Sequence, residues 1–174
     1  MVSARWPVRL ATVEDAGEVA RLLHDFNTEF NTASPGVSVL TPRLTSLLAG
    51  VSAFAVLAGD PSVSVALVTL RPHVWYEGPV AILEELYVAP ELRDRGIGST
   101  VIDLVLSTAR ARGVELVEIN VDESDVDAMR FYERHGFTAV EPTTGEGAFY
   151  FHQELAGRQP PPPSSGTETD PSQL

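Results

Sequence analysis

The sequence predicts a single α/β domain over residues 1–155, with a mixed, mostly antiparallel sheet of about six to seven strands flanked by about four helices. Segments of strand and helix type follow one another along the chain without an internal repeat. One of them, Val80–Val88, is apolar on both faces, which is typical of a central strand. The length of 174 residues and the apolar fraction of 44% suit one domain with a substantial core.

The N-terminal half is predicted to begin with a short strand at Val8–Ala11. A helix follows to about Phe30, because apolar residues recur at helical spacing from Ala16 onward. Residues 31–39 are rich in Ser, Thr, Pro and Gly and predict a loop, and Pro42 is expected to begin a second short helix that ends near Gly50. A hairpin with its turn at 59–62 comes next, formed by the strands Ser52–Ala58 and Val63–Leu70.

The C-terminal half is predicted to alternate helices and strands after the central strand. Gly113 and Gly136 are expected to end the two helices, since glycine readily adopts the left-handed conformation found there. Residues 156–174 include four consecutive prolines and are mostly small or polar, so they are expected to form a disordered tail. The predicted elements are the helices Ile97–Arg112 and Asp125–His135 and the strands Val114–Val121, Phe137–Val140 and Ala148–Gln153.

The composition excludes several classes of chemistry. The chain has no cysteine, which excludes disulfides, cysteine–zinc sites and an acyl-cysteine intermediate, and it has no lysine, which excludes a Walker loop and a Schiff base. The net charge of −12 disfavours nucleic acid and anionic membranes and favours a cationic partner. No spacing of His, Asp and Glu indicates a metal site. The N-terminus lacks a signal-peptide core and no apolar run could span a bilayer, so a cytoplasmic protein is expected.

The sharpest local signal is the loop between the central strand and the next helix. Gly96 and Gly98 let the backbone turn tightly with its amides exposed. The helix that follows directs its free N–H groups and positive dipole end at this turn, an arrangement that binds phosphate. Arg93 and Arg95 add positive charge there, although two solvated loop arginines would look the same.

The type of phosphate ligand follows from the spacing of the glycines. A dinucleotide fingerprint needs a third glycine, where this chain has Val101, and it usually follows the first strand of its domain. A Walker loop needs the pair Gly-Lys, which cannot occur here. The remaining common anion site of the strand–turn–helix type is the one for the pyrophosphate of coenzyme A.

Three motifs in order resemble the GNAT superfamily of N-acetyltransferases. The phosphate loop matches the family pattern Arg/Gln-x-x-Gly-x-Gly/Ala, and one helix and one strand separate it from the last motif, as in the family. The resemblance extends over residues 7–154 in element order and is specific from Glu84 to Phe137. The three motifs are the strand Leu83–Pro90, the loop Arg93–Gly98 and the segment Ala128–Phe137.

The resemblance implies a GNAT-like domain that binds acetyl-CoA and transfers the acetyl group directly to an amine. Many members carry Asn where this chain has Asp125, although an aspartate can still cap the helix. Asn120 is an expected cofactor contact whose alternative is a strand-end cap. The predicted cofactor-binding residues are Leu86, Tyr87, Val88, Arg93, Asp94, Arg95, Gly96, Ile97, Gly98, Ser99, Thr100, Asn120, Asp125, Ala128, Phe131 and Tyr132.

Glu84 is the predicted general base. Strand alternation would place it in one row with Leu86 and Val88, where burial would raise the pKa of its carboxyl group toward a useful value. Glu85 would then point the other way and is the weaker candidate. The alternatives for Glu84 are binding of the substrate's positive charge and a structural role.

Two further catalytic roles come from the resemblance. It implies that Tyr132 lies near the sulfur of coenzyme A, where its hydroxyl can protonate the leaving thiolate; the alternative is an ordinary core tyrosine. It also implies that pantetheine lies along the central strand, so the Val88 N–H is the expected donor to the developing oxyanion.

The acceptor is predicted to be a primary amine of a small, cationic molecule or of a basic side chain. In the family the acceptor side is built from the first two helices and the late hairpin. Asp25 and Glu29 are four residues apart on the first helix and could attract a cation, or could simply be solvated. Trp75 and Tyr76 either line the pocket or pack in a loop. The resemblance also allows a homodimer.

Two other functions fit parts of the sequence. A non-catalytic regulatory module would bind acetyl-CoA without turnover, and substitution of Glu84 or Tyr132 would then affect binding alone. An unrelated nucleotide-binding domain would bind a dinucleotide in competition with coenzyme A. The co-occurrence of Glu84, Tyr132 and the phosphate loop favours the enzyme.

Overall fold

The computed structural model of the chain describes residues 6–141, 143–153 and 155, and its centre is a five-stranded sheet. The strands lie in the order of the sequence, antiparallel except for the last pair, which is parallel. This confirms the predicted α/β domain with a mixed, mostly antiparallel sheet. The strands are β1 (Val8–Leu10), β2 (Ala53–Gly59), β3 (Ser62–Arg71), β4 (Val80–Val88) and β5 (Leu116–Ile119).

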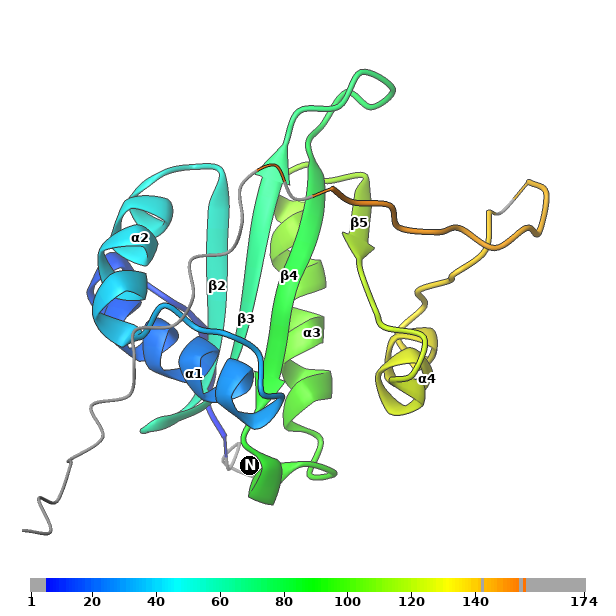
Figure 1. Ribbon diagram of the computed structural model, residues 1–174. Coiled ribbons are helices and arrows are strands. Elements are labelled where there is room, and N and C mark those ends of the chain that lie inside the picture. The colour runs from blue at the N-terminus through cyan, green and yellow to red at the C-terminus, as the bar shows by residue number, and fades with distance from the viewer. Residues whose placement is uncertain (1–5, 142, 154, 156–174) are drawn as a thin grey trace, which may run out of the picture.

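Helices cover both faces of the sheet (Figure 1). The first two pack against one face and bury the cluster that contains Leu22, Leu44 and Leu57, while the third packs on the opposite face against Phe54, Val56 and Leu83. The fourth helix lies beyond β5 (Figure 1). The helices are α1 (Ala16–Glu29), α2 (Val37–Ala49), α3 (Ile97–Ala111) and α4 (Val126–Arg134), with short 3₁₀ turns η1 (Val13–Asp15) and η2 (Pro90–Leu92).

The sequence pattern explains why these segments form these elements. In α1 the apolar stripe that predicted the helix is buried against the sheet, with Val19 and Ala20 fully covered. Every residue of β2 is buried, as expected for a strand that is covered on both faces. Gly113 and Gly136 follow α3 and α4 with φ of 74° and 87°, which confirms their predicted role at the helix ends.

The second helix begins earlier than predicted. It starts at Val37 inside the expected loop, and Pro42 lies in its interior instead of at its start. Proline lacks the N–H that would bond to the Ser38 carbonyl, but burial of Leu44 against the other helices compensates for that loss.

The two final strands of the prediction are not formed in the described part of the chain. Between Val140 and Gly147 there is one isolated bridge, and residues 148–153 form no ladder. A strand is stable only when it pairs with another strand and packs one face against the core. Phe149 and Phe151 are 83% and 88% exposed, so this segment is not packed in that way. The predicted tail, 156–174, lies outside the described residues.

The last two strands of the sheet separate, and their separation positions the site. Val80–Leu83 of β4 pair with Leu116–Ile119 of β5, and the pairing then stops although β4 continues to Val88. The chain after β5 leads away toward α4 (Figure 1). The second half of β4 therefore presents an open edge.

Among the described residues, no helix is long and apolar enough to cross a membrane.

Candidate active site

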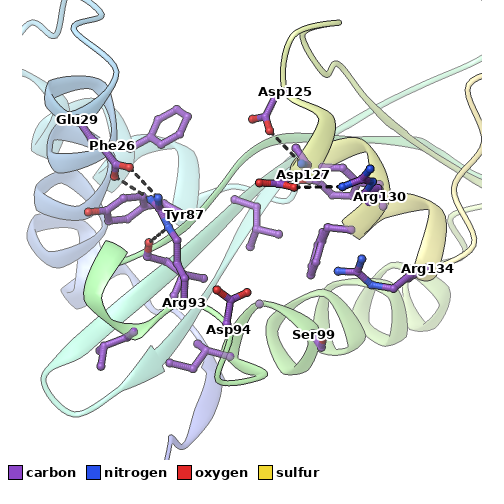
Figure 2. A pocket seen from close by; sticks show the side chains of 18 of the residues that line it. Phe26, Glu29, Tyr87, Arg93, Asp94, Ser99, Asp125, Asp127, Arg130 and Arg134 are labelled. Atoms are coloured by element: carbon purple, nitrogen blue, oxygen red, sulfur yellow. Dashed lines mark hydrogen bonds and ion pairs between the residues drawn. The ribbon is translucent and has the colours of Figure 1, made fainter.

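A groove opens where β4 and β5 separate. It has a cavity volume of about 1150 Å³ and is lined by the end of α1, the end of β4, the loop before α3, the first turn of α3, and the segment from residue 122 through α4. Three separate stretches of the chain, 26–30, 86–99 and 122–134, therefore meet at one space (Figure 2). A volume of this size suits an extended ligand.

The open edge of β4 directs backbone groups into this groove. The Ala89 N–H donates to the Val63 carbonyl at 2.9 Å, so the backbone of Ala89 faces β3. Successive residues of a strand direct their N–H and C=O groups to opposite sides, so those of Val88 and Leu86 face away from β3, toward the groove. The guanidinium of Arg93 donates its Nε–H to the Val88 carbonyl at 3.1 Å from this side. The Val88 N–H is thus placed to donate to a ligand.

The loop before α3 has the conformation of an anion-binding turn. Asp94 and Gly96 have positive φ angles of 58° and 80°, which turn the chain sharply into α3. The first N–H groups of an α-helix have no partner within it, so those of Ile97, Gly98 and Ser99 point back into the groove. A Cβ placed on Gly98 would lie 3.4 Å from the Phe131 ring, an ordinary van der Waals distance, so the first turn of α3 packs directly against α4. This cradle fits the pyrophosphate of coenzyme A.

Arg93 of this loop is held by an acidic residue from α1. Its guanidinium forms an ion pair with Glu29 at 2.8 Å and lies over the Tyr87 ring, 6.0 Å from the ring centroid. Figure 2 shows the pair bridging α1 and the loop. The Glu29 carboxylate therefore balances the charge of Arg93, and an incoming phosphate would compete with it for the same guanidinium.

Helix α4 forms the opposite wall. Asp125 is its N-cap, because its carboxylate accepts the Ala128 N–H at 2.9 Å, which confirms the capping role expected from the sequence. Tyr132 is 8% exposed and packs edge-on against Phe131 and Phe137. Burial raises the pKa of its hydroxyl, as do the nearby charges of Glu85 and Asp125. Tyr132 therefore keeps its proton at neutral pH and can donate it.

With this geometry in place, comparison with known proteins is decisive. Residues 22–137 match the family model described as the acetyltransferase (GNAT) family. The chain belongs to the GNAT family. A crystal structure of a putative acetyltransferase from Arthrobacter sp. FB24 is 47% identical, with a TM-score of 0.83 over 89% of this chain and 99% of that chain. These matches confirm the resemblance found in the sequence motifs.

Curated relatives agree on the family but differ in how much of each chain is matched. An uncharacterized N-acetyltransferase from Methanocaldococcus jannaschii is 38% identical over 66 residues, and the match spans 38% of this chain but only 29% of that relative's length. Thialysine N-epsilon-acetyltransferase from Bos taurus is 28% identical over 167 residues, which span 87% of this chain and 97% of the relative.

Most residues that the GNAT resemblance implied for the cofactor lie together in the groove. Arg95 and Asn120 are exposed and do not line it, and the Thr100 hydroxyl donates to the Gly96 carbonyl within the helix at 3.1 Å. The predicted residues that line the groove are Leu86, Tyr87, Val88, Arg93, Asp94, Gly96, Ile97, Gly98, Ser99, Asp125, Ala128, Phe131 and Tyr132.

The sequence analysis did not predict the other groove residues as cofactor contacts. Arg130 and Arg134 are four apart on α4 and share a helix face, a signal that the printed sequence contains but that no motif marked. The rest come from segments that only the fold brings close. They are Phe26, Glu29, Phe30, Leu92, Asp122, Ser124 and Asp127.

The predicted orientation of Glu84 and Glu85 is wrong. Leu67 of β3 pairs with Glu85 and Val68 pairs with Leu83, which leaves Glu84 as an extra residue in a β-bulge. The bulge interrupts the alternation, so Glu84 does not share a row with Leu86. Glu84 is exposed, and its carboxylate accepts a hydrogen bond from the Thr69 hydroxyl.

The two carboxylates of α1 that could attract a cation or be solvated are already paired. Asp25 contacts Arg21 at 3.2 Å, and Glu29 holds Arg93. Their charge is largely balanced within the protein, so they are poor candidates for an acceptor site. Trp75 is 83% exposed in the loop between β3 and β4 and does not line the groove. In the described ranges, no group of three or more acidic or His side chains is arranged to hold a metal ion.

Proposed function

We propose that this GNAT chain transfers the acetyl group of acetyl-CoA to the primary amine of a small, cationic acceptor or of a basic side chain. One observation carries the proposal: the Val88 N–H, the phosphate loop and the buried Tyr132 hydroxyl border one groove. Membership of the family implies acetyl-CoA as the cosubstrate. When bound, acetyl-CoA supplies an activated acetyl group.

In this proposal each part of the groove has a distinct task. The N–H groups at the start of α3 and the guanidinium of Arg93 bind the pyrophosphate. The Val88 N–H donates to the carbonyl oxygen of the acetyl group as negative charge develops there. The hydroxyl of Tyr132 supplies the proton that the leaving sulfur takes up when the carbon–sulfur bond breaks.

Two observations support a cationic amine as the acceptor. The net charge of −12 attracts cations, and β4 carries two adjacent carboxylates, Glu84 and Glu85, next to the groove. The relative from Bos taurus is named as a thialysine N-epsilon-acetyltransferase, and alkyl amines in general carry a positive charge at neutral pH.

The test is release of free coenzyme A from acetyl-CoA, followed with a thiol reagent across polyamines, aminoglycosides, amino acids and basic peptides. Each amine is assayed with the wild type and with Tyr132→Phe. Turnover that falls about 100-fold or more in the variant supports the proposal. Acetyl-CoA binding without turnover on any amine would instead support a non-catalytic regulatory module.

We also propose that the chain forms a homodimer through its last described segment. Residues 143–153, here called the C-terminal arm, turn in the loop beyond α4 and run back toward the sheet as an extended segment (Figure 1). Strand β5 is at the edge of the sheet, and no described strand pairs with its outer side. An unpaired edge and an exposed apolar segment in one chain can satisfy each other between two copies.

A further inference from the structure

The bulge in β4 places two neighbouring carboxylates on the same face of the sheet. Thr69 lies between Val68 and Leu70, which contact α3, so its own side chain faces the α1 and α2 layer, and Glu84 accepts its hydrogen bond there. Glu85 pairs with Leu67, whose side chain is buried in the same layer. Directly paired residues of an antiparallel ladder point to the same side. Both carboxylates therefore face α1 and α2.

The two carboxylates have different surroundings. Glu84 is exposed and is bonded to Thr69, whereas Glu85 is half-buried and has no hydrogen-bond or ion-pair partner among the described residues. Glu85 also directly precedes Leu86, the first residue of β4 that lines the groove. Neither carboxylate lines the groove itself, but Glu85 is the one next to it along β4, and its carboxylate is free to change its bonding.

The charges around Glu85 suit a group that exchanges protons at neutral pH. Burial and, to a smaller extent, the negative charge of Glu84 together raise the pKa of Glu85 to about 7. On the facing helix α4, the charge of Glu85 in turn helps to raise the pKa of Tyr132. Glu84 on its own strand is therefore the titratable group that acts on Glu85, while Tyr132 on α4 is a group on which the charge of Glu85 acts.

We infer that Glu85, and not Glu84, takes the proton from the acceptor amine, and that Glu84, fixed by Thr69, binds the acceptor's positive charge. This inference rests on the proposed transferase function. It reverses the order of the two residues that strand alternation alone predicted. The reason is the bulge, which brings Glu85 to the acceptor side and gives it the more apolar environment of the two.

The protons balance in the proposed step. The acceptor arrives as an ammonium ion, gives one proton to the Glu85 carboxylate, and attacks as a neutral amine; Glu85 later returns that proton to water. A nitrogen–carbon bond forms while the carbon–sulfur bond of the thioester breaks. Tyr132 gives its proton to the sulfur, and the second proton lost by the nitrogen restores the Tyr132 hydroxyl.

A carboxyl titration tests the inference without any enzyme assay. The full chain is labelled with ¹³C at the side-chain carboxyl carbons of glutamate, and their shifts are followed against pH by NMR. We expect one resonance with a midpoint near neutral pH that disappears in Glu85→Gln and persists in Glu84→Gln. Loss of that resonance in Glu84→Gln instead, or the absence of any such midpoint, would overturn the assignment.

The second test is the pH profile of turnover with the amine that the panel above shows to be the best acceptor. We expect Glu85→Gln to lower kcat by 100-fold or more and to remove the acidic limb of the profile, as loss of a general base does. Glu84→Gln should mainly raise KM and keep the limb. The reverse pattern, or undiminished turnover of Glu85→Gln, overturns the assignment alone, whereas a wild type without turnover on any amine overturns the proposed function as well.

Discussion

Arg134 differs from the other two arginines of the groove. Arg93 is paired with Glu29, and Arg130 lies 3.8 Å from Asp127. No carboxylate of the described residues is within ion-pair distance of Arg134, and its guanidinium points from α4 into the groove (Figure 2). An unpaired cation beside a phosphate loop loses no internal partner when an anion binds.

Arg134→Gln is therefore expected to weaken coenzyme A binding about 10-fold, because a hydrogen bond between charged groups contributes roughly 1.5–3 kcal/mol. The measurement is the Kd for coenzyme A by calorimetry. Arg110→Gln is the matched control, since Arg110 is an exposed arginine in the last turn of α3 that does not line the groove. Equal losses in both variants would point to net charge alone.

Glu85 has a consequence for stability that does not depend on catalysis. Its pKa in the folded protein is about 7, above the usual 4.5, so between these values the folded state holds a proton that the unfolded state has released. A rise in pH through this window therefore lowers the stability of the wild type. Glu85→Gln stays neutral throughout and loses nothing there.

We expect Glu85→Gln to stabilise the protein at about pH 8 by on the order of 1 kcal/mol, a figure reduced to allow for the solvent that still reaches the side chain. Near pH 4.5 the variant and the wild type should be equally stable, because the wild-type carboxyl is then protonated in the folded state. Urea denaturation at both pH values measures the difference. An equal gain in the free energy of unfolding at both pH values would show that the variant acts through packing and not through the charge of Glu85.

The phosphate loop gives a matched pair of glycines at the scale of one element. Gly96 has a φ of 80° and no atom within 4 Å of a Cβ placed on it, so an alanine there meets backbone strain alone. Gly98 lies in α3, where alanine is favoured over glycine. We expect Gly96→Ala to lower the free energy of unfolding by about 1–2 kcal/mol, and Gly98→Ala to have no such cost. Denaturant unfolding of both variants checks this; equal effects would contradict it.

The sequence predicted best the elements whose own pattern determines them. Strand β4 has the predicted bounds, Val80–Val88, because an apolar run of this kind is stable only in the middle of a sheet. The bulge at Glu84 was missed because one extra residue leaves the composition of the strand unchanged while it shifts every later side chain to the other face. The prediction of two final strands, Phe137–Val140 and Ala148–Gln153, was wrong for another reason: whether such segments form strands depends on a pairing partner, which their own sequence pattern does not specify.

In the site, too, features encoded by a contiguous stretch of sequence were predicted, whereas contacts between distant segments were not. The loop from Arg93 to Ser99 was found because its residues are contiguous and their spacing has a direct physical meaning. From the sequence, Glu29 could either attract a cationic acceptor or be solvated, and only the fold shows that it meets Arg93, 64 residues further along the chain. Contacts between distant segments depend on how the helices pack on the sheet, which no local pattern encodes.

At the scale of the whole molecule, the C-terminal arm and the edge of the sheet are complementary. Phe149, Tyr150 and Phe151 are 83%, 67% and 88% exposed, a large apolar surface for one short segment. No strand in the described part of the chain pairs with the outer edge of β5, so this edge offers N–H and C=O groups to a partner. A second copy presents both features again, so a symmetric exchange would cover two apolar arms and two strand edges at once.

Light scattering during size-exclusion chromatography should therefore give twice the chain mass of 18.8 kDa for the wild type. The variant Phe149→Ser/Phe151→Ser should give the mass of one chain, because the arm then has too little apolar surface to offset the loss of chain entropy on pairing. Trp75→Ser is the control, since Trp75 is equally exposed, at 83%, but lies in the loop between β3 and β4. A monomeric wild type would mean that the arm folds back on its own β5, and an unchanged dimer in the double variant would place the interface elsewhere.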